Sequence, residues 1–195
     1  MPILFATRNA HKAVEVRALL GAQLPVLTLD EVGYDGDPPE TSDTFVGNAL
    51  QKARDVFART GRLCVADDSG LEVAALGGAP GVHSRRFSPE QSAEANNALL
   101  LSRLAGVSDR RAAFRCVIAV VGPQGERTAS GRCDGRIGTA LQGTQGFGYD
   151  PLFWPDETPG RAMAELSLDE KNRISHRGRA FAQLAALLDD LGGVS

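Results

Sequence analysis

The chain has 195 residues, a net charge of −3, 43% hydrophobic residues and 23% charged residues. This composition is typical of a globular protein, with enough chain for one domain or two closely packed lobes. It excludes a membrane protein, since no apolar run approaches the roughly 20 residues of a membrane span, and the negative charge does not favour nucleic acid.

The cysteines and the first residues indicate the compartment. Cys64, Cys116 and Cys133 are far apart and have neither zinc-site nor disulfide spacing. The first residues lack the basic segment of a secretion signal. We therefore expect a reducing, cytoplasmic environment.

The first elements alternate between strand and helix. Residues 2–6 are predicted to form a strand, and a helix follows with Asn9 as its N-cap and Gly21 just past its end. Val14 is assigned to the apolar side of that helix. Residues 26–29 are predicted to form a second strand.

A polar, acidic loop comes next. Residues 30–43 carry several Asp and Glu residues and no Lys or Arg, whereas residues 171–179 are basic. An acidic segment and a basic segment in one small protein would suit a metal-bound polyphosphate, although two ordinary solvated loops would have the same pattern. Residues 44–60 have helical periodicity, and Gly61 is expected to end that helix. Lys52 in this helix could reach solvent or point into a cleft.

The most informative motif is Asp67-Asp68-Ser69-Gly70, which follows a predicted strand at residues 63–66 and precedes another at residues 71–74. Adjacent carboxylates repel and are unfavourable to bury unless a cation or hydrogen bonds compensate. One interpretation is a divalent-metal site at the carboxyl end of a strand. The other is a polar turn in which Gly70 adopts φ > 0.

The second half of the chain begins with a helix. Residues 88–91 have the pattern of its capping box, and it is expected to run to about Leu104. Residues 113–121 alternate like a strand, and residues 122–125 form a hairpin turn into residues 126–133. A final helix is expected over residues 174–191. Strands that first alternate with helices and then form a hairpin predict a mixed sheet.

Three other segments have the chemistry of nucleotide contacts. Residues 7–12 lie at a helix N-terminus, where unpaired N–H groups and Lys12 favour phosphate, but a capped surface helix would look the same. The glycines that flank Phe147 leave its ring open for base stacking, unless it is a core aromatic in a tight turn. Ser175 is expected to cap the last helix, where Arg177 can donate two hydrogen bonds to one acceptor.

Together, and in this order, these motifs resemble the inosine triphosphate pyrophosphatases, the Ham1-type nucleotide hydrolases. The matching segments span nearly the whole chain: Thr7-x-Asn9-x-x-Lys12, Glu40-Thr41, Asn48-Ala49, Lys52-Ala53-Arg54, Ala66–Leu71, Leu76–Val82, Phe147–Pro151, Met163–Leu166, Lys171-Asn172 and Ser175–Arg177. One departure is Arg85, which stands where the family often has a small residue. We expect Arg86 to keep the role of the family's arginine.

The resemblance implies an enzyme that hydrolyses noncanonical purine nucleoside triphosphates (ITP, dITP, XTP) to the monophosphate and pyrophosphate. The implied fold is α/β: an elongated mixed sheet with flanking helices, in a single domain 1–195 whose two lobes surround a central nucleotide cleft. The expected partners are the nucleotide and a second copy of the chain, without nucleic acid or membrane. Mg²⁺ is the expected cofactor, and Mn²⁺ is a possible substitute.

The resemblance also implies roles for individual residues. Asp68 would be the catalytic base, and Glu40 and Asp68 would bind the metal. The substrate-binding residues would be Thr7, Arg8, Asn9, Ala10, His11, Lys12, Lys52, Ser69, Phe147, Gly148, Tyr149, Asp150, Lys171, His176 and Arg177. Because Arg177 only donates hydrogen bonds, it would pair with the 6-oxo group of a purine and leave the 6-amino group of adenine unpaired.

Three alternatives remain open at this point. A haloacid-dehalogenase-like phosphatase uses aspartates after a strand, but its motif is Asp-x-Asp and the pair here is contiguous. A nucleotide- or RNA-binding module would use Phe147 and the basic segment, and the negative net charge disfavours it. A pyrophosphatase that acts on pyrimidine or methylated nucleotides would differ only in base preference.

Overall fold

The computed structural model describes residues 2–191, so residues 1 and 192–195, the ends of the predicted domain 1–195, lie outside the described residues. The chain divides into two compact units. Unit 1 comprises Met1–Asp68, Cys116–Gly131 and Arg177–Ser195, and unit 2 comprises Ser69–Arg115 and Arg132–His176.

The described chain contains a six-stranded sheet with the order β2-β1-β3-β4-β5-β6. Its strands are β1 (Ile3–Phe5), β2 (Val26–Thr28), β3 (Cys64–Val73), β4 (Arg111–Gly122), β5 (Gly125–Ile137) and β6 (Phe153–Pro155). Strand β1 pairs in parallel with β2 and with β3, while β5 and β6 are antiparallel. The expectation of a mixed α/β sheet is therefore confirmed.

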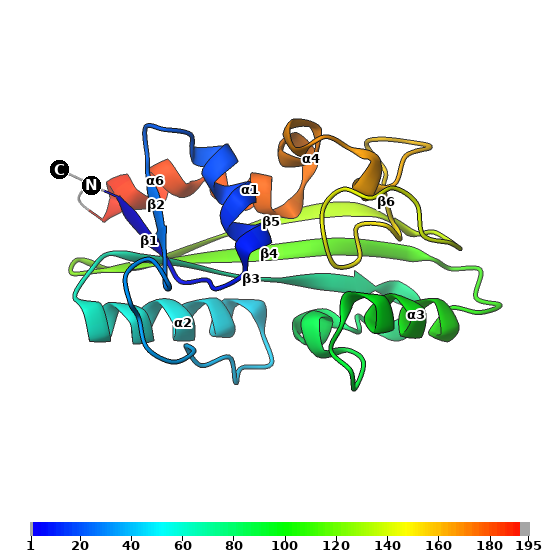
Figure 1. Cartoon of the computed structure of the whole chain (residues 1–195), viewed down its shortest axis with the longest axis horizontal. Coiled ribbons are helices and arrows are strands. Elements are labelled where there is room, and N and C mark those ends of the chain that lie inside the picture. The colour runs from blue at the N-terminus through cyan, green and yellow to red at the C-terminus, as the bar shows by residue number, and fades with distance from the viewer. Residues whose placement is uncertain (1, 192–195) are drawn as a thin grey trace. The chain divides into compact units, whose positions relative to one another are not determined.

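Unit 1 has helices on both faces of its strands. These are α1 (Ala10–Leu20), α2 (Phe45–Thr60), α5 (His176–Phe181) and α6 (Leu184–Asp190). Figure 1 shows α2 on one face and α1 and α6 on the opposite face. The predicted ends of α1 are confirmed, since the Asn9 side chain accepts hydrogen bonds from the first turn and Gly21 follows the last residue. Gly61 ends α2 in the left-handed conformation, as expected.

The core of unit 1 contains side chains from α1, α5 and α6 together with the strands, including Phe5, Val16, Ile118 and Phe181. Burying a side chain of this size stabilises the fold by about 1.5–3 kcal/mol. The assignment of Val14 to the apolar side of α1 is wrong. Val14 is 55% exposed, and the buried residues of the helix include Glu15 instead.

Unit 2 is built around a second core. Its helices are α3 (Ala93–Arg103) and α4 (Leu168–Ile174), with short 3₁₀ turns at Ala74–Leu76, Gly81–Arg86 and Met163–Glu165. Figure 1 shows α3 on one face of the strands of this unit and α4 on the other. Leu71, Leu100, Phe114 and Phe153 are among the buried residues of this core.

Strand β3 corrects the sequence analysis. It runs without interruption from Cys64 to Val73, so the polar turn and the separate strand at residues 71–74 are wrong. Gly70 does not have a positive φ. The two carboxylates therefore lie within a strand.

Two predicted helices are also corrected. Helix α3 does not start with the capping box at residues 88–91, because Gln91 has φ 53° and cannot continue a helix; Ser92 is the N-cap instead. The single helix over residues 174–191 is divided. Ser175 is extended between α4 and α5, and its role as a cap of the next helix stays a prediction. The side chain of Gln183, between α5 and α6, donates to the carbonyl of Ser130 at 2.9 Å.

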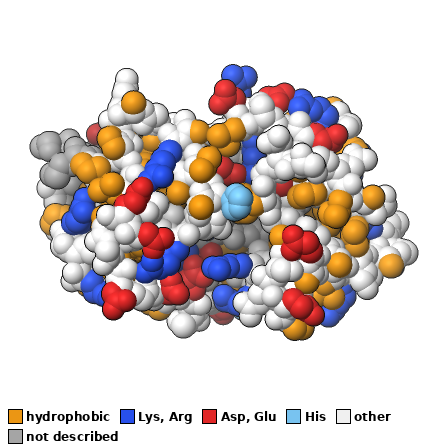
Figure 2. Space-filling view, viewed as in Figure 1, with side chains coloured by type: hydrophobic (Ala, Val, Ile, Leu, Met, Phe, Trp, Pro, Cys, Tyr) orange, Lys and Arg blue, Asp and Glu red, His pale blue; other side chains and the backbone are white. Residues whose placement is uncertain are grey.

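The surface carries charges of both signs. On the face drawn in Figure 2, acidic and basic side chains lie next to one another. The described residues also form exposed ion pairs such as Arg54–Glu126 and Arg111–Asp109. Each exposed pair adds only about 0–1 kcal/mol of stability. Within residues 2–191, no helix combines the length and the apolar character needed to cross a membrane.

Candidate active site

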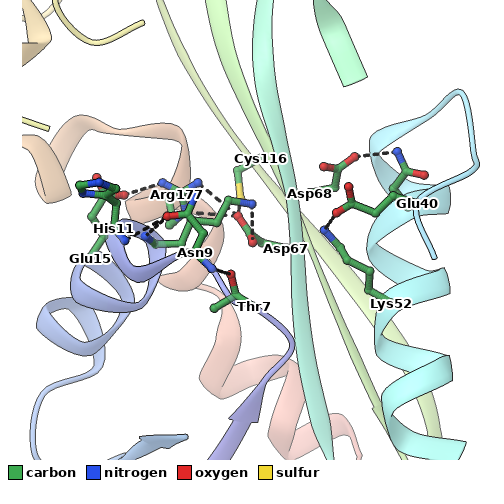
Figure 3. A network of polar contacts seen from close by, with 12 residues as sticks. Thr7, Asn9, His11, Glu15, Glu40, Lys52, Asp67, Asp68, Cys116 and Arg177 are labelled. Atoms are coloured by element: carbon green, nitrogen blue, oxygen red, sulfur yellow. Dashed lines mark hydrogen bonds and ion pairs between the residues drawn. The ribbon is translucent and has the colours of Figure 1, made fainter. Parts of the chain in front are cut away.

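Strand β3 separates the two adjacent aspartates. Successive side chains of a strand point to opposite faces, and Figure 3 shows Asp67 on the side of Arg177 and Asp68 on the side of Glu40 and Lys52. Each carboxylate therefore has its own set of partners. This arrangement explains how two neighbouring carboxylates can be buried in one strand.

Asp67 is surrounded by cations. Its carboxylate accepts hydrogen bonds from Lys12 Nζ at 2.8 Å and from Arg177 Nη2 at 3.2 Å, and the thiol of Cys116 lies 3.9 Å away. Burial would raise the pKa of Asp67, but the charges of Lys12, Arg177 and Lys52 outweigh it and hold the pKa well below its usual value. Asp67 therefore stays ionised as part of an ion-pair network.

Arg177 has a second carboxylate partner, Glu15 on α1. Arg177 Nη1 donates to Glu15 Oε2 at 2.5 Å, and both side chains are almost completely buried. Burial would lower the pKa of Arg177, but Asp67 and Glu15 raise it above its usual value. The guanidinium thus joins two buried carboxylates. Glu15 was not predicted from the sequence.

Asp68 and Glu40 belong to the other side of β3. Asn48 Nδ2 donates to Asp68 Oδ2 at 3.0 Å, and Lys52 is paired with Glu40. Both donors lie on α2, where Asn48 and Lys52 are one turn apart, so the helix presents them to the same region. The loop that precedes α2 supplies Glu40.

The surroundings shift the pKa values of Asp68 and Glu40 in opposite directions. Burial raises the pKa of Asp68, with the Glu40 charge adding to the effect, and this outweighs the opposing charges of Lys52 and Lys12. Burial also acts to raise the pKa of Glu40, but Lys52 outweighs it and lowers that pKa. Asp68 is therefore the more basic carboxylate of the pair, as a group that accepts a proton needs to be.

The donor set can be tested against a metal. Glu40 and Asp68 offer only oxygen atoms, and no group of three or more His, Cys, Asp and Glu residues within residues 2–191 could hold an ion. Mg²⁺ commonly binds through one or two carboxylates and completes its shell with water and phosphate oxygens. The two carboxylates fit such an ion and do not fit a closed zinc site.

The predicted phosphate segment is capped as expected. Asn9 Oδ1 accepts from the N–H groups of His11 and Lys12 at 3.0 and 3.2 Å, and the Asn9 N–H donates to Thr7 Oγ1 at 3.1 Å. Ala10 begins α1. A helix N-terminus of this kind favours an anion. Arg8 is the exception in this segment, because its guanidinium bonds to the acidic loop.

The predicted base-binding residues lie in unit 2, where Asp150 organises the loop around Phe147. Asp150 Oδ2 accepts from the Phe147 N–H at 2.8 Å and from Lys171 Nζ at 2.5 Å, and Lys171 Nζ lies 5.0 Å from the centroid of the Phe147 ring. Asp150 and Lys171 are buried, while Phe147 is only half-buried. The ring is thus fixed by a buried ion pair beneath its loop.

Two further contacts hold the same loop. Tyr149 donates its hydroxyl to the carbonyl of Ser84 at 2.8 Å, and burial raises its pKa. Asn97 Nδ2 on α3 donates to the carbonyl of Gly148 at 2.9 Å. Gly148, Tyr149 and Asp150 thus each contact another segment of unit 2, and Phe147 is held through its bond to Asp150.

His176 and Ser69, the remaining predicted residues of unit 2, have different surroundings. The ring of His176 is buried and stacks on Phe114, with centroids 4.7 Å apart and planes at 13°. Ser69 is half-buried in β3 directly after Asp68. Their roles toward a substrate stay predictions.

Gly146 provides a test of how firmly this loop is held. Its φ is 73°, and a Cβ at this position would lie 2.1 Å from Asp150 Oδ2. We expect Gly146→Ala to lower the free energy of unfolding by about 1–2 kcal/mol through backbone strain, and by about 1–3 kcal/mol more through overpacking. Equilibrium urea unfolding measures the change.

Gly148→Ala is the matched control. Gly148 has a similar φ of 62°, but no described atom lies within 4 Å of a Cβ there. This variant introduces the backbone strain of a positive φ without a close contact of the new Cβ. Equal losses of stability in the two variants would contradict the close approach of Gly146 to Asp150.

The structure thus places part of the predicted residues in two groups. We call the group in unit 1 the carboxylate–lysine cluster (Lys12, Glu40, Lys52, Asp67, Asp68) and the group in unit 2 the aromatic loop (residues 146–150). The residues missed from the sequence as functional partners are Glu15, Asn48 and Cys116. Asn48 had two signals, since it belongs to a family motif and lies one helical turn before Lys52. Glu15 had none, because its partner is 162 positions away.

Comparisons with known proteins identify the family. The sequence matches the Ham1 family over residues 3–187. It is 48% identical to a dITP/XTP pyrophosphatase of Mycolicibacterium paratuberculosis over 97% of both chains, and 49% identical to one of Geobacter sulfurreducens over 97% of this chain and 96% of that one.

A solved structure agrees with this result. The Staphylococcus aureus Ham1 protein superposes with a TM-score of 0.85 at 37% identity, covering 97% of this chain and 99% of that chain. Since the family match and the relatives span nearly the whole sequence, the chain belongs to the Ham1 family.

Proposed function

We propose that this protein hydrolyses noncanonical purine nucleoside triphosphates, such as ITP, dITP and XTP, to the nucleoside monophosphate and pyrophosphate. The observation that carries the proposal is the position of Asp68, a buried carboxylate of raised pKa beside Glu40 and Lys52, in a chain of the Ham1 family. Its relatives named dITP/XTP pyrophosphatase support the same substrate class.

The carboxylate–lysine cluster would act on the triphosphate. Asp68 orients a water molecule and accepts its proton as the oxygen attacks the α-phosphorus. The bond between that phosphorus and the bridging oxygen breaks, and pyrophosphate leaves. Lys12 and Lys52 offset the negative charge that develops on the leaving group. Mg²⁺ bound by Glu40 and Asp68 would supply further charge stabilisation for the phosphates.

The residues of unit 2 would hold the nucleoside. Phe147 offers a ring face to the purine, and the Asp150–Lys171 ion pair holds its loop. His176, whose ring stacks on Phe114, would also contact the nucleoside. Arg177, a residue of unit 1, has only donors, so a 6-oxo group would pair with it and the 6-amino group of adenine would not. Its present partners, Asp67 and Glu15, fix the orientation of the guanidinium.

Two properties implied by the family complete the proposal. We expect a homodimer, which sedimentation velocity would reveal as a mass near twice that of the 20.6 kDa chain. We also expect a cytoplasmic enzyme, since Cys64, Cys116 and Cys133 are free thiols buried in the fold.

Product analysis tests the function. Purified protein with Mg²⁺ is given ITP, XTP, dITP, ATP and GTP in parallel, and phosphorus NMR identifies the products. We expect pyrophosphate and the monophosphate from the first three, little reaction with ATP or GTP, and loss of activity when EDTA removes the metal. Orthophosphate would indicate a phosphatase instead, and a preference for pyrimidine or methylated nucleotides would indicate a different pyrophosphatase.

A further inference from the structure

Arg8 lies in the middle of the predicted phosphate segment, yet its guanidinium is engaged elsewhere. Arg8 Nε donates to Asp37 Oδ1 at 3.1 Å, and Nη2 donates to the carbonyls of Tyr34 at 2.6 Å and Gly36 at 2.8 Å. Nη1 is paired with Asp30. All three nitrogens therefore contact one stretch of the acidic loop.

We propose that Arg8 is a positioning residue that holds the acidic loop, and with it Glu40, in place. In this role it does not bind phosphate, unlike its neighbours in residues 7–12. The inference rests on the proposed function, because Glu40 matters there as a metal-binding carboxylate.

The chain between Arg8's contacts and Glu40 is short and stiff. Only Pro38 and Pro39 stand between Asp37 and Glu40. The ring of a proline fixes φ near −65°, so two consecutive prolines leave few conformations. A displacement of Asp37 should therefore displace Glu40 as well.

Glu40 is also held from its other side. The Thr41 N–H donates to Gln51 Oε1 at 3.0 Å, and the Ser42 N–H donates to Asn48 Oδ1 at 2.8 Å. Helix α2 thus fixes the residues that follow Glu40, whereas Arg8 fixes those that precede it. Loss of Arg8 should loosen Glu40 without unfolding the loop.

Two other arginines secure parts of the loop farther from Glu40. Arg17 bonds to Glu31 at 2.6 Å, and Arg59 stacks on the Tyr34 ring with its guanidinium carbon 4.2 Å from the centroid. Their contacts explain why an acidic, solvent-facing loop has a defined path. Arg8 differs from both because it reaches Gly36 and Asp37, and Asp37 directly precedes the two prolines.

The positioning role and a phosphate-binding role predict different kinetics for Arg8→Ala. If Arg8 positions Glu40, the Mg²⁺ concentration for half-maximal activity rises by about tenfold, as is usual when a residue supporting a metal ligand is lost. The KM for ITP at saturating Mg²⁺ then stays near that of the unchanged protein. If Arg8 binds phosphate, the KM for ITP rises at every Mg²⁺ concentration.

A second measurement needs no turnover. Hydrogen–deuterium exchange of the free protein reports the mobility of residues 30–43, and we expect faster exchange there in Arg8→Ala. Arg8→Lys should give nearly the same result, because an ammonium group cannot form the forked contacts of a guanidinium. Arg62→Ala, which removes another exposed arginine of unit 1, should change neither the exchange nor the Mg²⁺ dependence.

The outcomes separate the two proposals. Unchanged exchange in residues 30–43, or a raised KM for ITP with an unchanged Mg²⁺ requirement, would overturn the role of Arg8. Absence of any pyrophosphate release by the unchanged protein would overturn the proposed function instead, and the exchange experiment would still decide whether Arg8 holds the loop.

Discussion

Replacement of Asp68 by asparagine is expected to lower kcat for ITP by about 10²–10⁴-fold, the range for removal of a general base. The amide has the same shape as the carboxylate, but it cannot accept a proton from water. Its carbonyl oxygen can still accept the bond that Asn48 donates at 3.0 Å. The fold should therefore be kept, and pyrophosphate release under single-turnover conditions measures the loss.

The comparison for this variant is Asn48→Ala, which removes the donor to Asp68 and the acceptor of the Ser42 N–H but keeps the carboxylate. We expect a much smaller loss of kcat, because Asp68 can still act as a base. Circular dichroism and thermal unfolding verify that both variants are folded. Near-normal turnover by Asp68→Asn would exclude Asp68 as the base.

The largest effect on stability is expected for Arg177→Met. This change removes the guanidinium that pairs with the buried Glu15 and is also one of the cations around Asp67. Removing one member of a buried ion pair typically costs about 3–5 kcal/mol. Equilibrium unfolding in guanidinium chloride measures this loss, and a change below about 1 kcal/mol would contradict the network.

A double variant identifies the source of the instability. Glu15→Gln replaces the buried charge by a neutral amide, so Glu15→Gln with Arg177→Met should be more stable than Arg177→Met alone. The two effects are then non-additive, as expected for residues in contact.

The same Arg177 variant tests selectivity. We expect the ratio of ITP to ATP hydrolysis to fall, and an equal loss for both nucleotides would argue against a role in base recognition.

Elements with local signals could be predicted from the sequence. Helix α1 is defined by the capping side chain of Asn9 and by Gly21, and α2 by its apolar period and Gly61. The hairpin between β4 and β5 has turn residues at residues 122–125. In each case, the residues that decide the structure are near one another in the chain.

Elements decided by distant contacts could not be predicted. Asp67-Asp68-Ser69-Gly70 has good turn chemistry, but Lys12, Arg177 and Asn48 neutralise or bond the two carboxylates, so the strand continues. The last helix is divided because the chain is extended at Ser175 and Gln183 bonds to β5. The tertiary partners override the local preference.

The candidate site shows the same limit. The family motifs name Glu40, Lys52 and Asp68, but no motif shows that Glu15 completes the network of Arg177. Nor does the position of Arg8 in a phosphate segment show that its guanidinium reaches Asp37. A residue's type and neighbours indicate which groups it can bind, whereas its actual partner depends on how the chain folds back.

The ion pairs of the carboxylate–lysine cluster have a consequence for which anions can enter. Lys12 and Lys52 are already neutralised by Asp67 and Glu40. A bare phosphate that drew Lys12 away would remove a counter-ion of the buried Asp67, and one that drew Lys52 away would remove the partner of Glu40. An anion that arrives with a divalent cation brings the replacement charge with it. We therefore expect the cluster to bind a metal–nucleotide complex more readily than free phosphate.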